Sequence, residues 1–505
     1  MSPVISKNKK YYDLNGIFQL ANACILIAIL YLYFLKGPND YINGYTIAIS
    51  VVFGAQNSML LIWERKSREP LLMLLMLTII PFYLLRVATL LYEPWSEVLP
   101  RFPFTPNDMN HALLFIMLST LSISLGIKSA DFCNRFSRKV PRFSTFSENA
   151  PTRLFVIMIV IIVFDALSAL GENVFGSLRG YISILFYADI VLTLLITVFA
   201  INYTSLSSKQ KYSYLFLFFV FLVVRTLTGS RSALLTIALS VLYVCFAMLR
   251  TVRIKKQLIV LIIMMLPLLP VIFSVTTFWR PYRIAKLQGV IEATPTDFLT
   301  EYLNNVTSDA FDENLKIVLR PMFDRVGYLD MAADMIANSD KYNVVIDPIY
   351  YTKSVIDNVL TPGYDVFDVP RAANNTVSIY NNIPLLNKSM VDNYYQSDMF
   401  TIFGEFYVLF KGYFAVFACF LMGFFSKLLF EAINFSNMMW HYSFRAIFFK
   451  LYVLSLWSFG LDWQLEDLLF FLISIGCLYV LTAIKLPRIS LFCTGRRFAD
   501  NKLLN

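Results

Sequence analysis

The stretch LFLFFVFLVVRTLTGSRSALLTIALSVLYVCFAML, residues 215–249, decides the fold class. Two apolar runs flank a Thr-Gly-Ser turn, with Arg225 before the turn and Arg231 after it. Apolar runs of this length are typical of membrane helices, whereas a guanidinium at membrane depth marks a functional site or an interface anchor. The stretch therefore predicts two membrane helices joined by a tight, positively charged turn.

The rest of the chain has the same apolar character. Of its 505 residues, 57% are hydrophobic and 15% are charged, whereas soluble proteins carry about a quarter charged residues. We expect an all-α polytopic membrane protein with about twelve transmembrane helices, each near the roughly 20 residues that cross a bilayer. The expected spans are 17–35, 45–63, 70–91, 111–127, 154–170, 181–201, 213–228, 232–249, 258–278, 401–425, 444–461 and 467–485.

The formal net charge of +9 could indicate a nucleic-acid partner. Most Lys and Arg residues instead fill every second loop, at 7–10, 65–68, 128–153, 209–211, 250–256 and 485–502. Because positively charged loops stay in the cytoplasm, we expect both termini there and the turn at 228–230 on the outer face. The positive charge therefore indicates membrane orientation, and we expect no nucleic-acid partner.

One long segment interrupts the short loops. It covers residues 279–399, between an expected membrane part at 1–278 and a second membrane part with a cytoplasmic tail at 400–505. Within it, LKIVLRPMFDRVGYLDMAADMIANSD has apolar residues at helical spacing, which predicts an amphipathic helix ending near Asn338. We expect a large, mostly helical outer loop between the ninth and tenth spans.

Arginines gather on the outer side of this map. Arg231 follows Ser230, a residue type typical of helix N-caps, so the first amides and the dipole of the next helix favour an anion there. Gly229 permits a tight turn, and arginine forks match phosphate oxygens. The sequence predicts an anion at the outer leaflet, most simply the pyrophosphate of a lipid carrier. The alternative is that each arginine only reaches the lipid headgroups. The other arginines on this side are Arg86, Arg225, Arg280, Arg283, Arg320, Arg325 and Arg371.

Carboxylates form the second group of candidates. Glu405, at the outer mouth of the expected tenth span, is either a general base or a counter-ion to an arginine. The expected outer loop GLDWQLED carries Asp462, Glu466 and Asp467. Each of them is a general base, a counter-ion to an arginine or a solvated residue of the loop. A single histidine such as His111 is more often structural than a donor or acceptor of a proton. The chain has two histidines, no Cys-x-x-Cys pattern and no nucleotide-binding loop, so we expect neither a metal nor a cofactor.

Four features of the sequence carry a family resemblance. They are the turn TGSRSALL, the long outer loop, the R…R…GYLD pattern from Arg320 to Asp330, and the stretch GEFYVLFKGYFAVFACFLMGF from Gly404. Pro370-Arg371 adds a fifth match near the end of the loop. With these motifs the chain resembles the bacterial oligosaccharide repeat-unit polymerases, the O-antigen polymerase (Wzy-type) family. One departure is LFKG, which stands where that family tends to have Asn-Phe-Gly.

The resemblance implies a GT-C-like glycosyltransferase of the bacterial cytoplasmic (inner) membrane. Such enzymes move a growing glycan from undecaprenyl pyrophosphate onto a new lipid-linked repeat unit at the periplasmic face, for lipopolysaccharide O-antigen or for capsule. The implied catalytic residues are Arg231, Arg320 and Glu405. The residues implied to bind pyrophosphate or glycan are Arg225, Gly229, Ser230, Arg280, Arg283, Arg325 and Arg371.

Two other functions fit a similar topology. One is the ligase that moves a finished O-antigen onto a lipid core, and the other is a flippase that carries the lipid-linked unit across the membrane. A chain-length regulator and a flippase are the expected protein partners of a polymerase.

Overall fold

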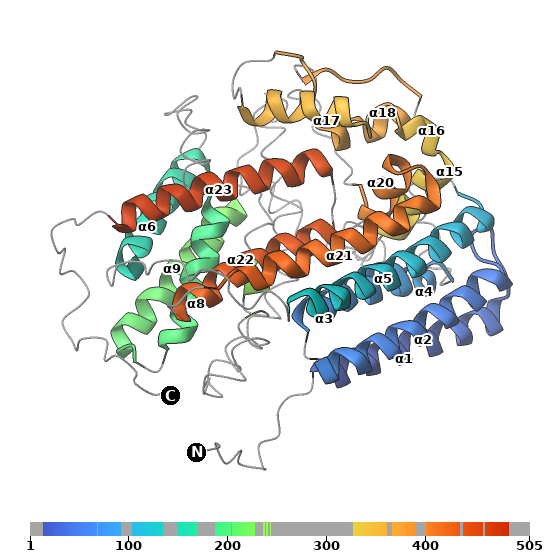
Figure 1. The fold of residues 1–505 in the computed structure, drawn as a ribbon, viewed down its shortest axis with the longest axis horizontal. Coiled ribbons are helices and arrows are strands. Elements are labelled where there is room, and N and C mark those ends of the chain that lie inside the picture. Colours follow the sequence, from blue (N-terminus) through green and yellow to red (C-terminus); the bar gives the residue numbers. More distant parts are fainter. Residues whose placement is uncertain are drawn as a thin grey trace, which may run out of the picture. The chain divides into compact units, whose positions relative to one another are not determined.

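The computed structural model describes residues 14–67, 69–91, 104–134, 150–169, 187–203, 205–227, single residues between 236 and 243, 327–360, 366–380, 382–388, 400–434, 438–457 and 460–483. In these ranges every secondary-structure element is a helix, as predicted for the fold class (Figure 1). The expected ninth span and most of the eighth lie outside the described residues, as do the predicted boundaries at 278 and 399.

Five helical stretches of the described chain are long and apolar enough to cross a membrane, as a multi-pass membrane protein requires. They are Asn15–Lys36, Gly44–Glu64, Pro70–Leu91, Pro106–Phe132 and Gly412–Ala432. Five more helices stand where spans are expected, and the total of about twelve spans stays a prediction. These further helices are α6 (Ala150–Ala169), α8 (Ala188–Asn202), α9 (Ser208–Leu227), α22 (Met438–Trp457) and α23 (Leu461–Ala483).

The chain divides into two compact units. The first contains residues 1–141, 293–433 and 448–469, and the second contains residues 142–292, 434–447 and 470–505. The first unit therefore combines all five apolar spans with the described part of the expected outer loop. It also contains the first turns of α23.

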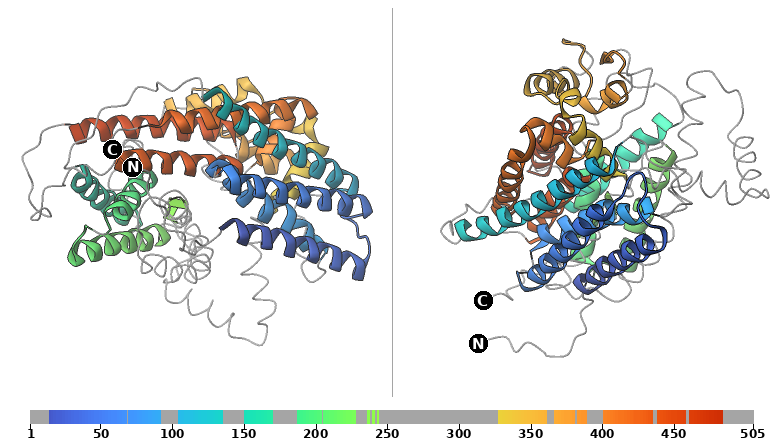
Figure 2. Two further views of the ribbon diagram at one scale, coloured as in Figure 1. Left: turned by 60° about the horizontal axis from the view of Figure 1, so that its bottom comes forward. Right: turned by 90° about the vertical axis from the view of Figure 1, so that its right-hand side faces the viewer.

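The first unit begins with α1 (Leu14–Lys36) and α2 (Gly44–Ser67), which lie side by side (Figures 1 and 2). The third span combines α3 (Pro70–Ile79), the π-helical turn η1 (Ile80–Leu84) and α4 (Leu85–Leu91). The loop between α1 and α2 is tied to α4, because the Asn39 side chain donates to the Leu90 carbonyl at 3.0 Å.

Two glycines bring α5 (Pro106–Asn134) and α21 (Ala415–Ala432) into backbone contact. A Cβ atom at Gly126 would lie 2.1 Å from the Phe420 carbonyl oxygen, and one at Gly423 would lie 2.2 Å from the Ile123 carbonyl oxygen. Small residues allow this close approach between membrane helices, where dispersion contacts replace the hydrophobic effect as the source of affinity. The two glycines therefore set the distance between α5 and α21.

A cluster of charges around the buried Lys427 lies near the C-terminal ends of the same two helices. The Lys427 ammonium forms ion pairs with Glu69, with Asp131 at 3.1 Å and with Glu431 at 3.0 Å. Glu69 is also the N-cap of α3, since its side chain accepts a hydrogen bond from the Leu71 amide. Lys427 is only 5% exposed, so these carboxylates supply the compensation that a buried ammonium requires.

The described part of the expected outer loop is mostly helical, as predicted. The predicted amphipathic helix is observed from Tyr328 to Ala337 and ends at Asn338, whereas residues 315–326 lie outside the described chain. Asp347 caps α17 by accepting hydrogen bonds from the amides of Ile349 and Tyr350, and Pro348 occupies the first helical position. The elements are α15 (Tyr328–Ala337), α16 (Ser339–Tyr342), α17 (Pro348–Val355), η4 (Ile356–Leu360), η5 (Ala372–Asn375) and α18 (Thr376–Tyr380).

The predicted tenth span, 401–425, consists of two separate pieces. The short helix α20 (Ile402–Leu409) is followed by Lys411 and Gly412, which have φ values of 54° and 83°. An α-helix cannot continue through left-handed backbone, so the chain turns before η6 (Gly412–Phe414) leads into α21. The prediction of one continuous span over 401–425 was therefore wrong: Glu405 lies in α20, and the apolar span begins at Gly412.

Candidate functional site

The site is built around Glu405, whose side chain is completely buried in the first unit. Gly404 lets α20 approach α15, because a Cβ atom there would lie 2.6 Å from the Met335 sulfur. Glu405 Oε1 accepts hydrogen bonds from the Tyr351 hydroxyl at 2.5 Å and from the Leu461 amide at 2.8 Å. Glu405 Oε2 is buried and has no hydrogen-bond partner among the described residues.

Burial changes the protonation of this carboxyl group. Loss of solvent raises the pKa of Glu405 to about 8, although the hydrogen bonds from Tyr351 and from the Leu461 amide act in the opposite direction. The group therefore exchanges its proton near neutral pH, which is the range that a general base or acid needs. Perturbed carboxyl groups of this kind are concentrated at functional sites.

The N-terminus of α23 completes the surroundings of Glu405. The sequence GLDWQLED was expected to be an outer loop, but α23 begins at Leu461, so Asp462 and Glu466 lie in its first two turns. The predicted loop is therefore a helix start. Acidic residues are favourable there, because the N-terminal end of a helix dipole is positive. Asp462 accepts from the Ser354 hydroxyl at 2.9 Å and from the Ala372 amide at 2.8 Å.

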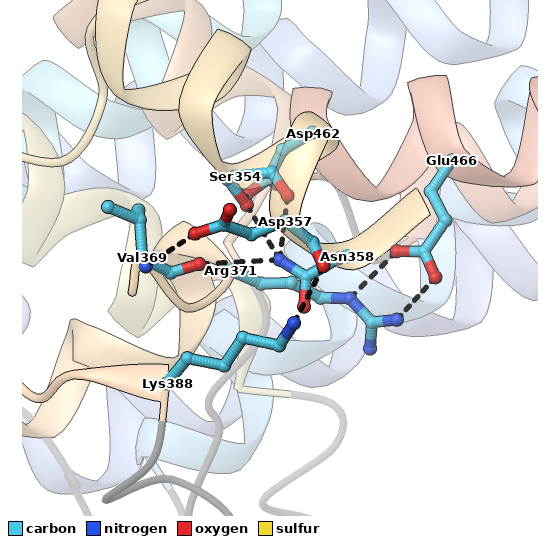
Figure 3. A network of polar contacts seen from close by, with 8 residues as sticks. All are labelled: Ser354, Asp357, Asn358, Val369, Arg371, Lys388, Asp462 and Glu466. Carbon is cyan, nitrogen blue, oxygen red and sulfur yellow. Dashed lines mark hydrogen bonds and ion pairs between the residues drawn. The ribbon is translucent and has the colours of Figure 1, made fainter. Parts of the chain in front are cut away.

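Arg371 is held beside these turns by Glu466. Its Nε and Nη2 atoms donate to the two oxygens of Glu466 at 2.8 and 2.5 Å, and the bidentate pair is visible in Figure 3. The side chain of Arg371 is 29% exposed, whereas that of Glu466 is 6% exposed. Arg371, which was predicted to bind pyrophosphate, therefore lies against the Glu466 carboxylate and in contact with solvent.

A buried aspartate shapes the loop that carries Arg371. Asp357 accepts hydrogen bonds from the amides of Val366, Phe367 and Val369 at 2.9 to 3.0 Å. Lys388 donates to the backbone carbonyl of Asp357 at 2.6 Å (Figure 3). One carboxylate thus binds three backbone amides within residues 366–369, which orients the segment just before Arg371.

A buried arginine, Arg86, joins the third apolar span to the segment 327–388. Arg86 and Asp330 form a bidentate pair, with Nε 3.0 Å from Oδ1, and their side chains are each 2% exposed. Arg86 was predicted near the outer end of the third span, and the structure places it in α4, directly after the π-helical turn. The Asp330 partner was not predicted.

Arg225 lies in the second unit, where its Nε atom is 2.9 Å from Asp165 Oδ2 and its guanidinium lies over the Phe221 ring. A role in pyrophosphate binding therefore stays a prediction for Arg225. The remaining predicted site residues fall outside the described chain. They are Gly229, Ser230, Arg231, Arg280, Arg283, Arg320 and Arg325.

Sequence reasoning missed Tyr351, Ser354 and Asp357. Tyr351 and Glu405 are 54 residues apart, and no periodicity or motif links them. The only available signal was the composition of the segment, which is rich in tyrosines, aspartates and prolines.

Within the described ranges, no group of three or more His, Cys, Asp or Glu residues is arranged to hold a metal ion. Comparison of the chain with protein-family models, with curated proteins and with solved structures finds no match.

Proposed function

We propose that the protein is a membrane-embedded glycosyltransferase that polymerises undecaprenyl-pyrophosphate-linked oligosaccharide units at the outer face of the bacterial cytoplasmic membrane. The product would be an O-antigen or a capsular polysaccharide. The observation that carries the proposal is the buried Glu405 carboxyl group, with one oxygen anchored by two donors and a proton affinity near neutral pH. The motifs that resemble repeat-unit polymerases supply the reaction class.

In this reaction the acceptor sugar hydroxyl attacks the anomeric carbon of the lipid-linked donor. The new glycosidic bond forms as the bond to the pyrophosphate breaks, and the proton of the hydroxyl passes to Glu405. The proton then leaves to solvent or to the released pyrophosphate. Glu405 suits the role of base because its Oε2 atom makes no other hydrogen bond among the described residues.

The leaving pyrophosphate gains negative charge as the bond breaks, so preorganised cations stabilise the transition state. Arg371 is the described candidate, because Glu466 orients its guanidinium and leaves part of it in contact with solvent. Arg231 and Arg320 are proposed on the resemblance, and the helix start after Ser230 would add amide donors.

The proposal is tested with Glu405→Gln in cells that depend on this protein for long polysaccharide. We expect the ladder of chain lengths on a gel to collapse to single repeat units, with normal amounts of protein in the membrane. Asp340→Asn is the matched control, since Asp340 is an exposed carboxylate of the same compact unit. Long chains in the Glu405→Gln cells would refute Glu405 as the base, and long chains in Arg231→Ala cells would refute Arg231.

The same cells separate the competing functions. Loss of a ligase would leave finished polymer on the carrier lipid. Loss of a flippase would leave single units on the cytoplasmic leaflet, where an impermeant label added outside cannot reach them. Single units on the outer leaflet are the result that only the polymerase proposal predicts.

A further inference from the structure

Tyr351 stands out among the residues near Glu405. It lies in the last turns of α17 and is 2% exposed, and its hydroxyl donates to Glu405 Oε1 at 2.5 Å. The Leu461 amide donates to the same oxygen at 2.8 Å. Both donors therefore occupy one oxygen of the carboxyl group, and the other oxygen, Oε2, makes no hydrogen bond among the described residues.

We propose that Tyr351 is a positioning residue that fixes the Glu405 carboxyl group so that Oε2 is the atom which takes the proton of the acceptor hydroxyl. This inference rests on the proposed function. A carboxyl group without fixed donors exchanges its two oxygens by rotation about its last side-chain bond. Two donors on Oε1 remove that freedom, which leaves Oε2 as the reactive atom.

The surrounding contacts hold both donors in place. Ser354 lies three residues after Tyr351, on the same side of α17, and donates to Asp462 at the start of α23. The amide of Leu461 precedes Asp462, so the contact between Ser354 and Asp462 also fixes the second donor. α17 and α23 thus form one frame that presents two donors to a single oxygen.

Tyr351 acts as a donor and not as a base. Burial, and next the Glu405 charge, raise the pKa of the Tyr351 hydroxyl well above its usual value, so the hydroxyl keeps its proton across the physiological range. Its hydrogen bond stabilises the ionised form of Glu405 and lowers the pKa of that carboxyl group. Removal of the hydroxyl should therefore make Glu405 harder to ionise.

The first experiment follows the Glu405 carboxyl band by infrared spectroscopy during a pH titration of the purified full-length protein in lipid nanodiscs. The difference between the wild type and Glu405→Gln identifies the band. Tyr351→Phe should move the titration midpoint upward by about one pH unit, the size expected for one lost hydrogen bond to a charged group. An unmoved midpoint would overturn the proposal.

Two measurements make this result specific. Tyr350→Phe is the matched control, because the neighbouring tyrosine donates to the Pro370 carbonyl at 3.1 Å and not to Glu405, and it should leave the midpoint in place. Wild-type protein grown with 3-fluorotyrosine has more acidic, stronger donors and should move the midpoint downward. The second measurement needs no substitution that could prevent folding, and its failure would also overturn the proposal.

The second experiment measures polymerisation against pH. Tyr351→Phe should lower the rate several-fold at neutral pH and regain it at higher pH, whereas a purely structural role would lower the rate equally at every pH. If Tyr351→Phe moves the infrared midpoint but Glu405→Gln still polymerises, Glu405 is not the base, and only the hydrogen-bond coupling of the two residues stands. If Glu405→Gln is inactive but Tyr351→Phe keeps the wild-type midpoint and profile, the positioning role fails.

Discussion

The Arg86 guanidinium and the Asp330 carboxylate pair across 244 residues of sequence, and both are almost completely buried. Arg86 belongs to the third apolar span, and Asp330 belongs to α15, the first described helix of the expected outer loop. The pair therefore attaches α15 to this span through a buried contact. Among the described residues, Arg86 Nη1 has no hydrogen-bond partner, and the carboxylate of Asp330 compensates this buried charge.

This pair should be strongly coupled. Arg86→Leu or Asp330→Leu alone leaves one buried charge without its partner, which costs about 3–5 kcal/mol of unfolding free energy. The double variant removes both charges, so it should be much more stable than the sum of the single effects. Unfolding of the four proteins in detergent gives the coupling energy. Additive single effects would show that the two charges do not depend on each other.

The contact between α5 and α21 gives a second prediction. Gly423→Ala places a Cβ atom 2.2 Å from the Ile123 carbonyl oxygen, so the helices must separate, at a cost of about 1–3 kcal/mol for overpacking. Gly476→Ala is the matched control, because a Cβ atom there meets nothing within 4 Å. In a helix that exchange should be neutral or stabilise by about 0.5–1 kcal/mol. Thermal unfolding compares the two, and equal effects would contradict the proposed contact.

The sequence predicted the helices far better than the contacts between them. Long apolar runs reveal membrane spans because hydropathy is a local property, and the end of α15 at Asn338 follows from its periodicity. The break at Lys411 was missed because the chain is apolar on both sides of Lys411-Gly412 and was treated as one span. Hydropathy does not encode the left-handed backbone of the turn between α20 and α21.

The site shows the same division. Glu405 and Arg371 could be chosen from their residue types, and the structure places each against the first turns of α23. Their partners could not be chosen, because the Tyr351 contact depends on how α17 packs, and the N-terminus of α23 was expected to be a loop. The same sequence of charged residues is compatible with a helix start and with a solvated loop. Only the fold shows which of the two structures the residues adopt.

The last prediction concerns the stability of the protein as a function of pH. The folded protein holds the proton of Glu405 up to a pKa of about 8, whereas the unfolded chain releases it near the ordinary value of 4.5. Folding is therefore penalised as the pH rises from 4.5 to about 8, by up to about 1.4 kcal/mol per pH unit. Glu405→Gln imitates the protonated group and escapes this penalty. The variant should thus gain stability relative to wild type across that interval and keep a constant advantage above it, whereas the exposed exchange Asp340→Asn should follow wild type throughout. Chemical unfolding at a series of pH values measures the difference, and a flat difference for Glu405→Gln would mean that Glu405 is already ionised in the folded protein at neutral pH.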